Sequence, residues 1–297
     1  MTKIVEVKDL SKHYGKVKAV DNVSFKLEEG KIYGLLGRNG AGKTTIMHML
    51  TAQIFKTSGE LKVFGEEPYE NENVLNRICF IKESQKYPET FRVKDVLNVS
   101  PLFFPNWDKE FAMALVEDFR LPLKRRMKKL SRGMLSAVGI VVGLASRAPL
   151  TVFDEPYLGL DAVSRNLFYD RLLEDYGEHP RTIVLSTHLI DEVSQLLEHV
   201  LVIDGGKLLL DEEAETLRGN ASNVVGAAAK VESFVSGKKV IHRAPFGGLM
   251  SATVLGQLSA QDRMSAVELG LEIGPVSLQQ MVVHMAGGNG KSGEAAQ

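Results

Sequence analysis

The most constraining feature of the sequence is a glycine-rich segment between an apolar stretch and a helical stretch. Residues 31–36 are mostly apolar and predict a buried strand, and residues 43–53 have the periodicity of a helix. The residues that join the two stretches read Gly37-Arg38-Asn39-Gly40-Ala41-Gly42-Lys43-Thr44. They match the pattern G-x-x-x-x-G-K-[ST] in full, and the flanking strand and helix are the context in which that pattern binds phosphate.

The residue types in this loop suit a nucleoside triphosphate. Glycines let phosphate oxygens approach the backbone, where successive N–H groups and the positive end of the following helix meet their charge. We expect Lys43 to reach the β and γ phosphates and the Thr44 hydroxyl to bind Mg²⁺. Thr45, the next residue, is expected to belong to the same phosphate-binding segment.

A second candidate feature is a pair of acidic residues at the end of an apolar run. Residues 150–153 predict a buried strand, and Asp154 and Glu155 follow it directly. Parallel α/β sheets bind ligands at the carboxyl ends of their strands. Asp154 is therefore expected to bind Mg²⁺, and Glu155 to accept a proton from an attacking water.

Alternation of strand and helix patterns predicts an α/β fold with a parallel sheet. Residues 3–7 and 21–27 alternate apolar and polar side chains and predict a small antiparallel β layer before the glycine-rich loop. Residues 90–147 predict a helical insert, in which Phe103, Phe104 and Trp107 are expected to pack in the core, with a docking patch as the alternative. Together these segments define an expected cassette of residues 1–212.

The composition changes beyond residue 212. Residues 213–297 hold seven acidic and seven basic residues, far fewer per residue than the cassette. Strand and helix patterns predict a small α+β accessory domain over residues 213–286. Residues 287–297 are polar and glycine-rich, and we expect a disordered tail there.

Net charge and apolar runs exclude several classes of protein. The 297 residues include 36 Lys and Arg against 37 Asp and Glu, so the charge gives no reason to expect nucleic acid as a partner. A membrane-spanning helix needs about 20 mostly apolar residues, and no such run is present. The one cysteine, Cys79, lies in an apolar run and is expected to be a core side chain of a protein in a reducing compartment.

Three further short motifs follow in a fixed order. Leu130-Ser131-Arg132-Gly133-Met134 precedes a predicted helix, Gly159-Leu160-Asp161 follows the acidic pair, and Ser186-Thr187-His188 ends the next predicted strand. With the glycine-rich loop and the acidic pair, they make the first 212 residues resemble the ATP-binding subunit of an ABC transporter. The resemblance implies a P-loop ABC cassette fold, ATP and Mg²⁺ as ligands, and ATP hydrolysis.

The resemblance also implies roles for single residues. Tyr14 is expected to stack on adenine, and His188 to contact the γ phosphate. Ser131 and Gly133 are expected to bind the γ phosphate held by a second subunit, and Asp161 to lie at the same nucleotide. One copy then cannot close a site, so the resemblance implies a homodimer or a heterodimer with a related ATPase subunit.

Two segments depart from the family pattern. The signature of the family reads LSGGQ, and this chain keeps Ser131 and Gly133 but has Arg132 in place of the first glycine and Met134 in place of the glutamine. The family also carries a glutamine in the loop after the strand at residues 78–81. Here either Glu83 has replaced that glutamine as a Mg²⁺ contact or Gln85 is displaced from it, and the register favours Glu83.

The resemblance implies a protein that drives a separate transmembrane permease from the cytoplasmic face of the membrane. The signature and the appended domain look like those of bacterial exporters of peptides, antibiotics or toxic compounds. Import of a nutrient is an alternative. A DNA or ribosome ATPase is a second alternative, disfavoured because the chain has one cassette and no sustained heptads.

Overall fold

The computed structural model describes residues 2–83 and 85–288, which form two compact units. Unit 1 comprises Met1–His188 and Leu196–Leu208, and unit 2 comprises Leu189–Gln195 and Leu209–Gln297. Residues 289–297 of the expected tail lie outside the described residues. Within the described part, no helix combines the length and apolar character that a bilayer crossing needs.

Unit 1 is built on a six-stranded sheet in the order β5-β6-β7-β3-β8-β9. Strands β5, β6, β7, β3 and β8 run parallel, as the alternation of strands and helices predicts. Their side chains are almost all buried, which explains the near-continuous apolar runs. The bounds are β3 Ile32–Leu36, β5 Ile78–Ile81, β6 Leu150–Asp154, β7 Thr182–Thr187, β8 His199–Asp204 and β9 Lys207–Glu213.

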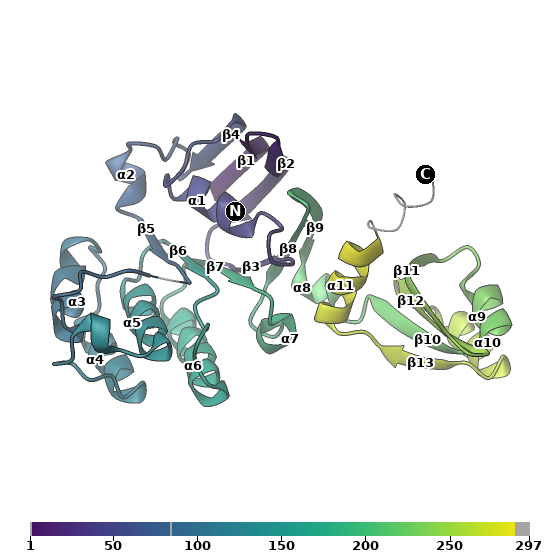
Figure 1. Cartoon of the computed structure of the whole chain (residues 1–297). Helices are drawn as coiled ribbons and strands as arrows, with labels where there is room; N and C mark the ends of the chain where they lie inside the picture. Colours follow the sequence, from purple (N-terminus) through teal and green to yellow (C-terminus); the bar gives the residue numbers. More distant parts are fainter. Residues whose placement is uncertain (1, 84, 289–297) are drawn as a thin grey trace. The chain divides into compact units, whose positions relative to one another are not determined.

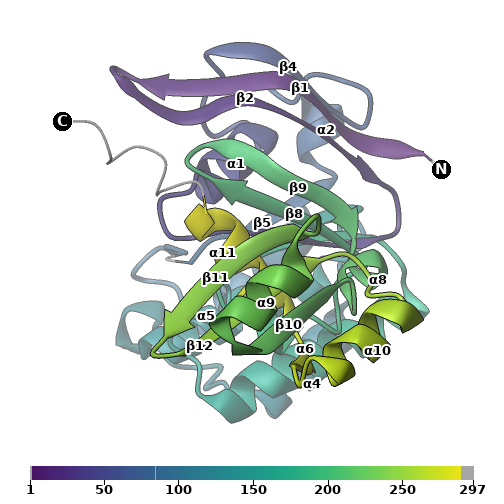
Figure 2. The ribbon, with the colours of Figure 1, turned by 90° about the vertical axis from the view of Figure 1, so that its right-hand side faces the viewer.

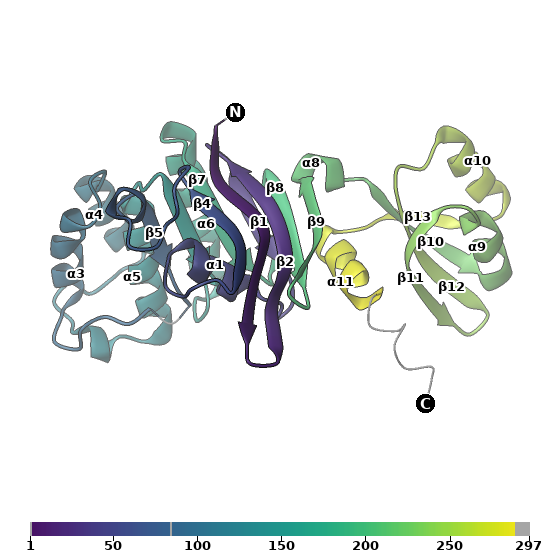
Figure 3. The same ribbon diagram turned by 90° about the horizontal axis from the view of Figure 1, so that it is seen from above.

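An antiparallel sheet in the order β2-β1-β4 forms the N-terminal layer of unit 1, and Figure 3 shows β1 and β2 as one long hairpin. Helix α1 (Lys43–Leu50) contributes Ile46, Met47 and Leu50 to the core that both sheets share. The strands are longer than the sequence indicates, because register shifts carry polar residues through the hairpin. Their bounds are β1 Lys3–Tyr14, β2 Val17–Glu28 and β4 Ser58–Val63, and α2 (Glu72–Leu75) follows β4.

Between β5 and β6 the chain forms helices, and Figure 1 shows α3 and α4 grouped beside α5 at one end of unit 1. Ser131 is the N-cap of α5, as its position before the helix predicts. The expectation that Phe103 packs in the core is wrong, because its side chain is 64% exposed. The bounds are α3 Val93–Val99, η1 Ser100–Leu102, α4 Lys109–Asp118, η2 Met127–Lys129, α5 Arg132–Ala145 and α6 Ala162–Glu178.

Unit 2 contains a four-stranded antiparallel sheet in the order β11-β12-β10-β13. The chain order β10-α9-β11-β12-α10-β13 is the β-α-β-β-α-β arrangement of ferredoxin-like folds. Helices α9 and α10 cover one face and α11 lies on the other (Figure 2). The bounds are α7 Ile190–Val193, α8 Ala214–Leu217, β10 Ala221–Ala227, α9 Ala228–Val235, β11 Lys239–Phe246, β12 Leu249–Leu255, α10 Ala260–Glu268, β13 Glu272–Pro275 and α11 Leu278–Gly288.

Candidate functional site

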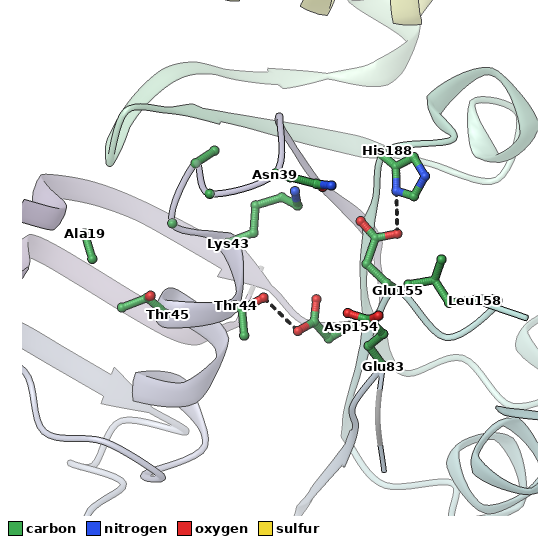
Figure 4. A pocket seen from close by; sticks show the side chains of 13 residues that line it. Ala19, Asn39, Lys43, Thr44, Thr45, Glu83, Asp154, Glu155, Leu158 and His188 are labelled. Atoms are coloured by element: carbon green, nitrogen blue, oxygen red, sulfur yellow. Dashed lines mark hydrogen bonds and ion pairs between the residues drawn. The ribbon is translucent and has the colours of Figure 1, made fainter. Parts of the chain in front are cut away.

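The carboxyl ends of β3, β6 and β7 meet at one edge of the parallel sheet and carry most of the predicted site. The register pairs Leu36 with Thr187 and Asp154 with Ser186, so the segments that follow these strands start side by side. A pocket of about 570 Å³ opens there (Figure 4). The residues that line it are Ala19, Asn39, Gly40, Ala41, Gly42, Lys43, Thr44, Thr45, Glu83, Asp154, Glu155, Leu158 and His188.

The glycine-rich loop wraps from β3 into α1 with its backbone packed tightly against neighbouring strands. Gly37 has φ 152°, and a Cβ built there would lie 2.1 Å from the carbonyl oxygen of Ile203. Only glycine fits this position, since neither the backbone angle nor the space admits a side chain. The N-cap of α1 is Gly42, which has no side chain to cap the helix, so the helix N-terminus suits an anionic ligand.

Lys43 is the buried cation of the pocket. Its Nζ donates hydrogen bonds to the carbonyl oxygens of Gly37, at 2.7 Å, and Arg38, at 3.2 Å. Burial lowers the pKa of Lys43, and the nearby carboxylates of Glu155 and Asp154 act in the opposite direction. Backbone oxygens therefore hold the Lys43 ammonium inside the loop. Phosphate oxygens, being charged, would be stronger hydrogen-bond acceptors for the same ammonium.

Asp154 and Thr44 lie next to each other in the pocket (Figure 4) and fit a divalent cation. The Thr44 hydroxyl donates a hydrogen bond of 2.9 Å to Oδ2 of Asp154. Oδ1 of Asp154 is buried and has no hydrogen-bond partner among the described residues. Hydroxyl and carboxylate oxygens are the ligands that Mg²⁺ prefers, so this donor set suits it.

Of the two candidates for the glutamine position, Glu83 lies at the pocket and Gln85 does not. Glu83 is among the lining residues, whereas Gln85 lines an apolar groove elsewhere. The Glu83 carboxylate also accepts a hydrogen bond of 2.8 Å from the guanidinium of Arg132. A carboxylate at this position can face a cation or pair with Arg132.

Glu155 lies next to His188 and is held by a third side chain. Its Oε2 is 2.8 Å from Nδ1 of His188 and accepts a hydrogen bond from the hydroxyl of Tyr157. Its Oε1 is buried without a hydrogen-bond partner in the described part of the chain. One carboxylate oxygen is thus occupied and the other is left to accept a proton.

The remaining predicted site residues are not among those that line this pocket. Tyr14 is 51% exposed at the end of β1, with the Lys12 ammonium 5.0 Å from its ring centre. Asp161 caps α6 by accepting a 2.8 Å hydrogen bond from the Ser164 N–H. Ser131 is exposed and caps α5 by accepting a 3.2 Å bond from the N–H of Met134.

Gly133 has a structural reason to be glycine within this chain. A Cβ at Gly133 would lie 2.4 Å from the carbonyl oxygen of Gly159, so α5 packs directly on the loop that follows β6. Ser136 strengthens the same contact by donating a 2.6 Å hydrogen bond to the carbonyl of Leu158. The signature segment and the loop after the acidic pair therefore form one packed element.

Sequence reasoning missed Tyr157, which is 3% exposed and contacts Glu155 directly. Its place two residues after the acidic pair was the available signal, but a tyrosine in an apolar segment is commonly a core residue. Ala19 and Leu158 were also missed, and both line the pocket. Neither carries a polar group that a motif search could have found.

Known proteins resemble this chain along the cassette. The family model described as ABC transporter matches residues 20–158. The bacitracin transport ATP-binding protein BcrA of Bacillus licheniformis is 34% identical over 212 residues, which are 70% of this chain and 69% of the relative. The ATP-binding protein YcbN of Bacillus subtilis, an uncharacterized ABC transporter component, is 33% identical over 76% of this chain and 74% of its own length.

A solved structure also matches. An ATP-binding subunit of an ABC transporter superposes with a TM-score of 0.65 and 25% identity, over 71% of this chain and 90% of that chain. The fold of unit 1, the glycine-rich loop and these similarities lead to the same assignment. The chain belongs to the family of ABC transporter ATP-binding subunits, which are nucleotide-binding ATPases.

Proposed function

We propose that this chain binds ATP with Mg²⁺ at the carboxyl edge of the parallel sheet and hydrolyses it to drive a separate permease. The observation that carries the proposal is the convergence of five side chains on one pocket. They are the side chains of Lys43, Thr44, Asp154, Glu155 and His188. They supply a cation for the phosphates, oxygens for a metal ion and a carboxylate for a water molecule.

Each of these pocket residues has its own role in phosphoryl transfer. The glycine-rich loop and Lys43 bind the phosphates, and the ammonium offsets the charge that develops on the leaving diphosphate. Thr44, Asp154 and Glu83 would hold Mg²⁺, which neutralises phosphate charge when bound. Oε1 of Glu155 accepts a proton from the attacking water, and His188 steadies the γ phosphate.

A dimer would complete the site. Ser131 and Gly133 lie at the N-terminus of α5 and do not line the pocket of their own chain in the described residues. In a head-to-tail dimer they would contact the γ phosphate held by the other subunit, with the positive end of α5 directed at it. Tyr14, being exposed, is free to stack on adenine, and Asp161 would lie at the dimer contact.

An apolar groove in unit 1 is the proposed docking site for an apolar helix of the permease. The groove has a volume of about 610 Å³ and lies between β5 and the helical insert, with Phe80, Tyr87, Val96 and Leu102 in its walls. Leu102 is 81% exposed at its rim. Exposed apolar side chains around a groove are typical of a protein interface.

A basic run of five exposed cations lies beside this groove, at residues 124–129. Backbone hydrogen bonds place the run there, because the Val93 N–H donates to the carbonyl of Arg125 and the Met127 N–H donates to the carbonyl of Phe91, which lines the groove. Clusters of this kind bind anionic lipid surfaces. The groove and the run together support a position on the inner face of the cell membrane.

We further propose that the system exports a peptide or an antibiotic. The proposal is supported by the names of two relatives, a bacitracin transport protein and the lantibiotic transport ATP-binding protein SrtF of Streptococcus pyogenes.

We also propose residues 1–212 as the cassette, with the helical subdomain at 90–147, and residues 213–286 as an accessory domain. The accessory domain would stabilise the dimer or regulate hydrolysis.

The test compares the wild-type chain with Glu155→Gln. The variant is expected to bind ATP, to lose about 10²–10⁴-fold in hydrolysis rate and to accumulate as a dimer with ATP on gel filtration. Glu60→Gln is a matched control, since Glu60 is an exposed glutamate that is not among the residues lining the pocket. Undiminished turnover by Glu155→Gln would contradict the assignment.

Transport of labelled peptide in inside-out vesicles, with the copurified permease, distinguishes export from import.

A further inference from the structure

Tyr157 lies at the meeting point of the two segments that carry Glu155 and His188. It follows Glu155 by two residues, and its side chain is buried against the end of β7. Its hydroxyl contacts three groups, which are Oε2 of Glu155, Oγ1 of Thr187 and the backbone N–H of His188 at 3.3 Å. A single hydroxyl therefore joins the loop after β6 to the tip of β7.

The direction of each hydrogen bond follows from the number of protons that each group can donate. A tyrosine hydroxyl has one proton to donate and can accept two hydrogen bonds. An ionised carboxylate only accepts, so the Tyr157 proton goes to Glu155, and the Thr187 hydroxyl and the His188 N–H donate to Tyr157. Burial raises the pKa of Tyr157, as does the charge of Glu155, so the hydroxyl keeps its proton and remains a donor.

The two groups on Oε2 of Glu155 differ in their freedom to move. The His188 side chain is 41% exposed and borders the open pocket, so it can turn away toward a bound phosphate. Tyr157 is 3% exposed, and two further hydrogen bonds join it to Thr187 at the end of β7 and to the backbone N–H of His188, so it stays in place. With the imidazole of His188 turned toward a phosphate, Tyr157 would be the remaining hydrogen-bond partner of Oε2 among the described residues.

We propose that Tyr157 is a positioning residue for hydrolysis, which fixes Oε2 of Glu155 so that Oε1 faces the attacking water. The inference rests on the proposed role of Glu155 and adds the side chain that orients it. The buried and unpartnered Oε1 is the oxygen that this arrangement presents. Tyr157 touches neither substrate nor water in this scheme and acts only through Glu155.

The test removes the hydroxyl and keeps the ring. Tyr157→Phe is expected to lower kcat about ten- to hundredfold, the effect of a catalytic group displaced by about an ångström, while KM for ATP changes less than about twofold. Tyr176→Phe is the matched control. Its hydroxyl also donates to a carboxylate, that of Glu198, and contacts the carbonyl of Gly30, outside the pocket. This control is expected to keep the wild-type kcat.

A double variant shows whether Tyr157 acts through Glu155. In a Glu155→Gln background, adding Tyr157→Phe is expected to change the residual rate less than about twofold, because the orienting bond then serves no base. An unchanged kcat in Tyr157→Phe, or a full additional loss in the double variant, overturns the inference. A rise in KM that matches the fall in kcat would also overturn it. Wild-type turnover that Glu155→Gln leaves intact overturns the proposed function itself.

Discussion

Arg132 and Glu83 form an ion pair in which the guanidinium donates a 2.8 Å hydrogen bond to the carboxylate. The pair joins the first residue of α5 to the loop after β5, and both residues depart from the family pattern. The two side chains are 66% and 46% exposed, so water and salt weaken the attraction. The pair adds little stability to the fold. Because Glu83 also lines the nucleotide pocket, Arg132 competes with a metal ion for its carboxylate.

Arg132→Ala is therefore expected to lower the Mg²⁺ concentration that gives half-maximal hydrolysis, because Glu83 becomes free to face the metal ion. Glu83→Gln is expected to raise that concentration, since a neutral amide is a weaker partner for Mg²⁺ than a carboxylate. Hydrolysis rates measured over a Mg²⁺ titration at saturating ATP check both. Equal midpoints in the wild type and both variants would exclude Glu83 from the metal site.

Gly133→Ala is expected to destabilise unit 1 by about 1–3 kcal/mol, because the new Cβ would lie 2.4 Å from the backbone oxygen of Gly159. Gly177→Ala is the matched control. A Cβ at this helical position meets nothing within 4 Å, so the change is expected to add up to about 1 kcal/mol through helix propensity. Urea unfolding followed by circular dichroism measures both. A Gly133→Ala chain as stable as the wild type would show that α5 can shift freely.

Cys79 is expected to resist thiol reagents in the folded chain. It is 1% exposed, and burial raises the pKa of its thiol to about 12, so almost no thiolate is present at neutral pH. Labelling with a chromogenic disulfide at pH 8 is expected to be slow in buffer and to reach one equivalent in concentrated urea. Rapid labelling of the folded chain would mean that the apolar groove beside β5 opens readily.

Unit 2 is expected to lose stability as the pH falls from 7 to 5. His284 accepts or donates a hydrogen bond with Thr253 at 3.1 Å and stacks on His242, with ring centres 4.0 Å apart. Burial lowers the pKa of His284 below 6.5, and the charge of His242 adds to that effect. The unfolded state then binds more protons near pH 6, so stability present above the unfolded pKa is lost on acidification.

His284→Gln is expected to flatten this dependence, because glutamine keeps a polar group near Thr253 but does not titrate. Hydrogen exchange of α11 amides at pH 5, 6 and 7 reports the local stability. The same loss of protection at pH 5 in the variant would assign the effect to another group.

Much of the fold could be predicted because the information is local. The strands predicted at residues 31–36 and 150–153 are present as β3 and β6, since near-continuous apolar runs mark them clearly. Strand β9 was not predicted, because its charged end at residues 211–213 looks like a linker and edge strands tolerate charge. The helix predicted at residues 43–53 ends earlier, at Leu50 of α1.

The candidate site could be predicted only in part. The glycine-rich loop and the acidic pair are contiguous in sequence, so their spacing alone indicated their chemistry. The Arg132 to Glu83 ion pair and the contacts of Tyr157 with Thr187 and His188 join residues about 30 to 50 positions apart. No periodicity or motif encodes such side-chain contacts, which depend on how the strands and helices pack.

Glu155 has a left-handed backbone, with φ at 48°. A non-glycine residue in that region costs about 1–3 kcal/mol, and such strain persists where surrounding contacts hold it. At Glu155 those contacts are the side chains of Tyr157 and His188. The residue proposed to activate water therefore has a strained backbone conformation. Glycine at this position would remove the backbone strain, but it would also remove the carboxylate that accepts the proton. Selection for thermal stability alone would therefore lower the rate of ATP hydrolysis.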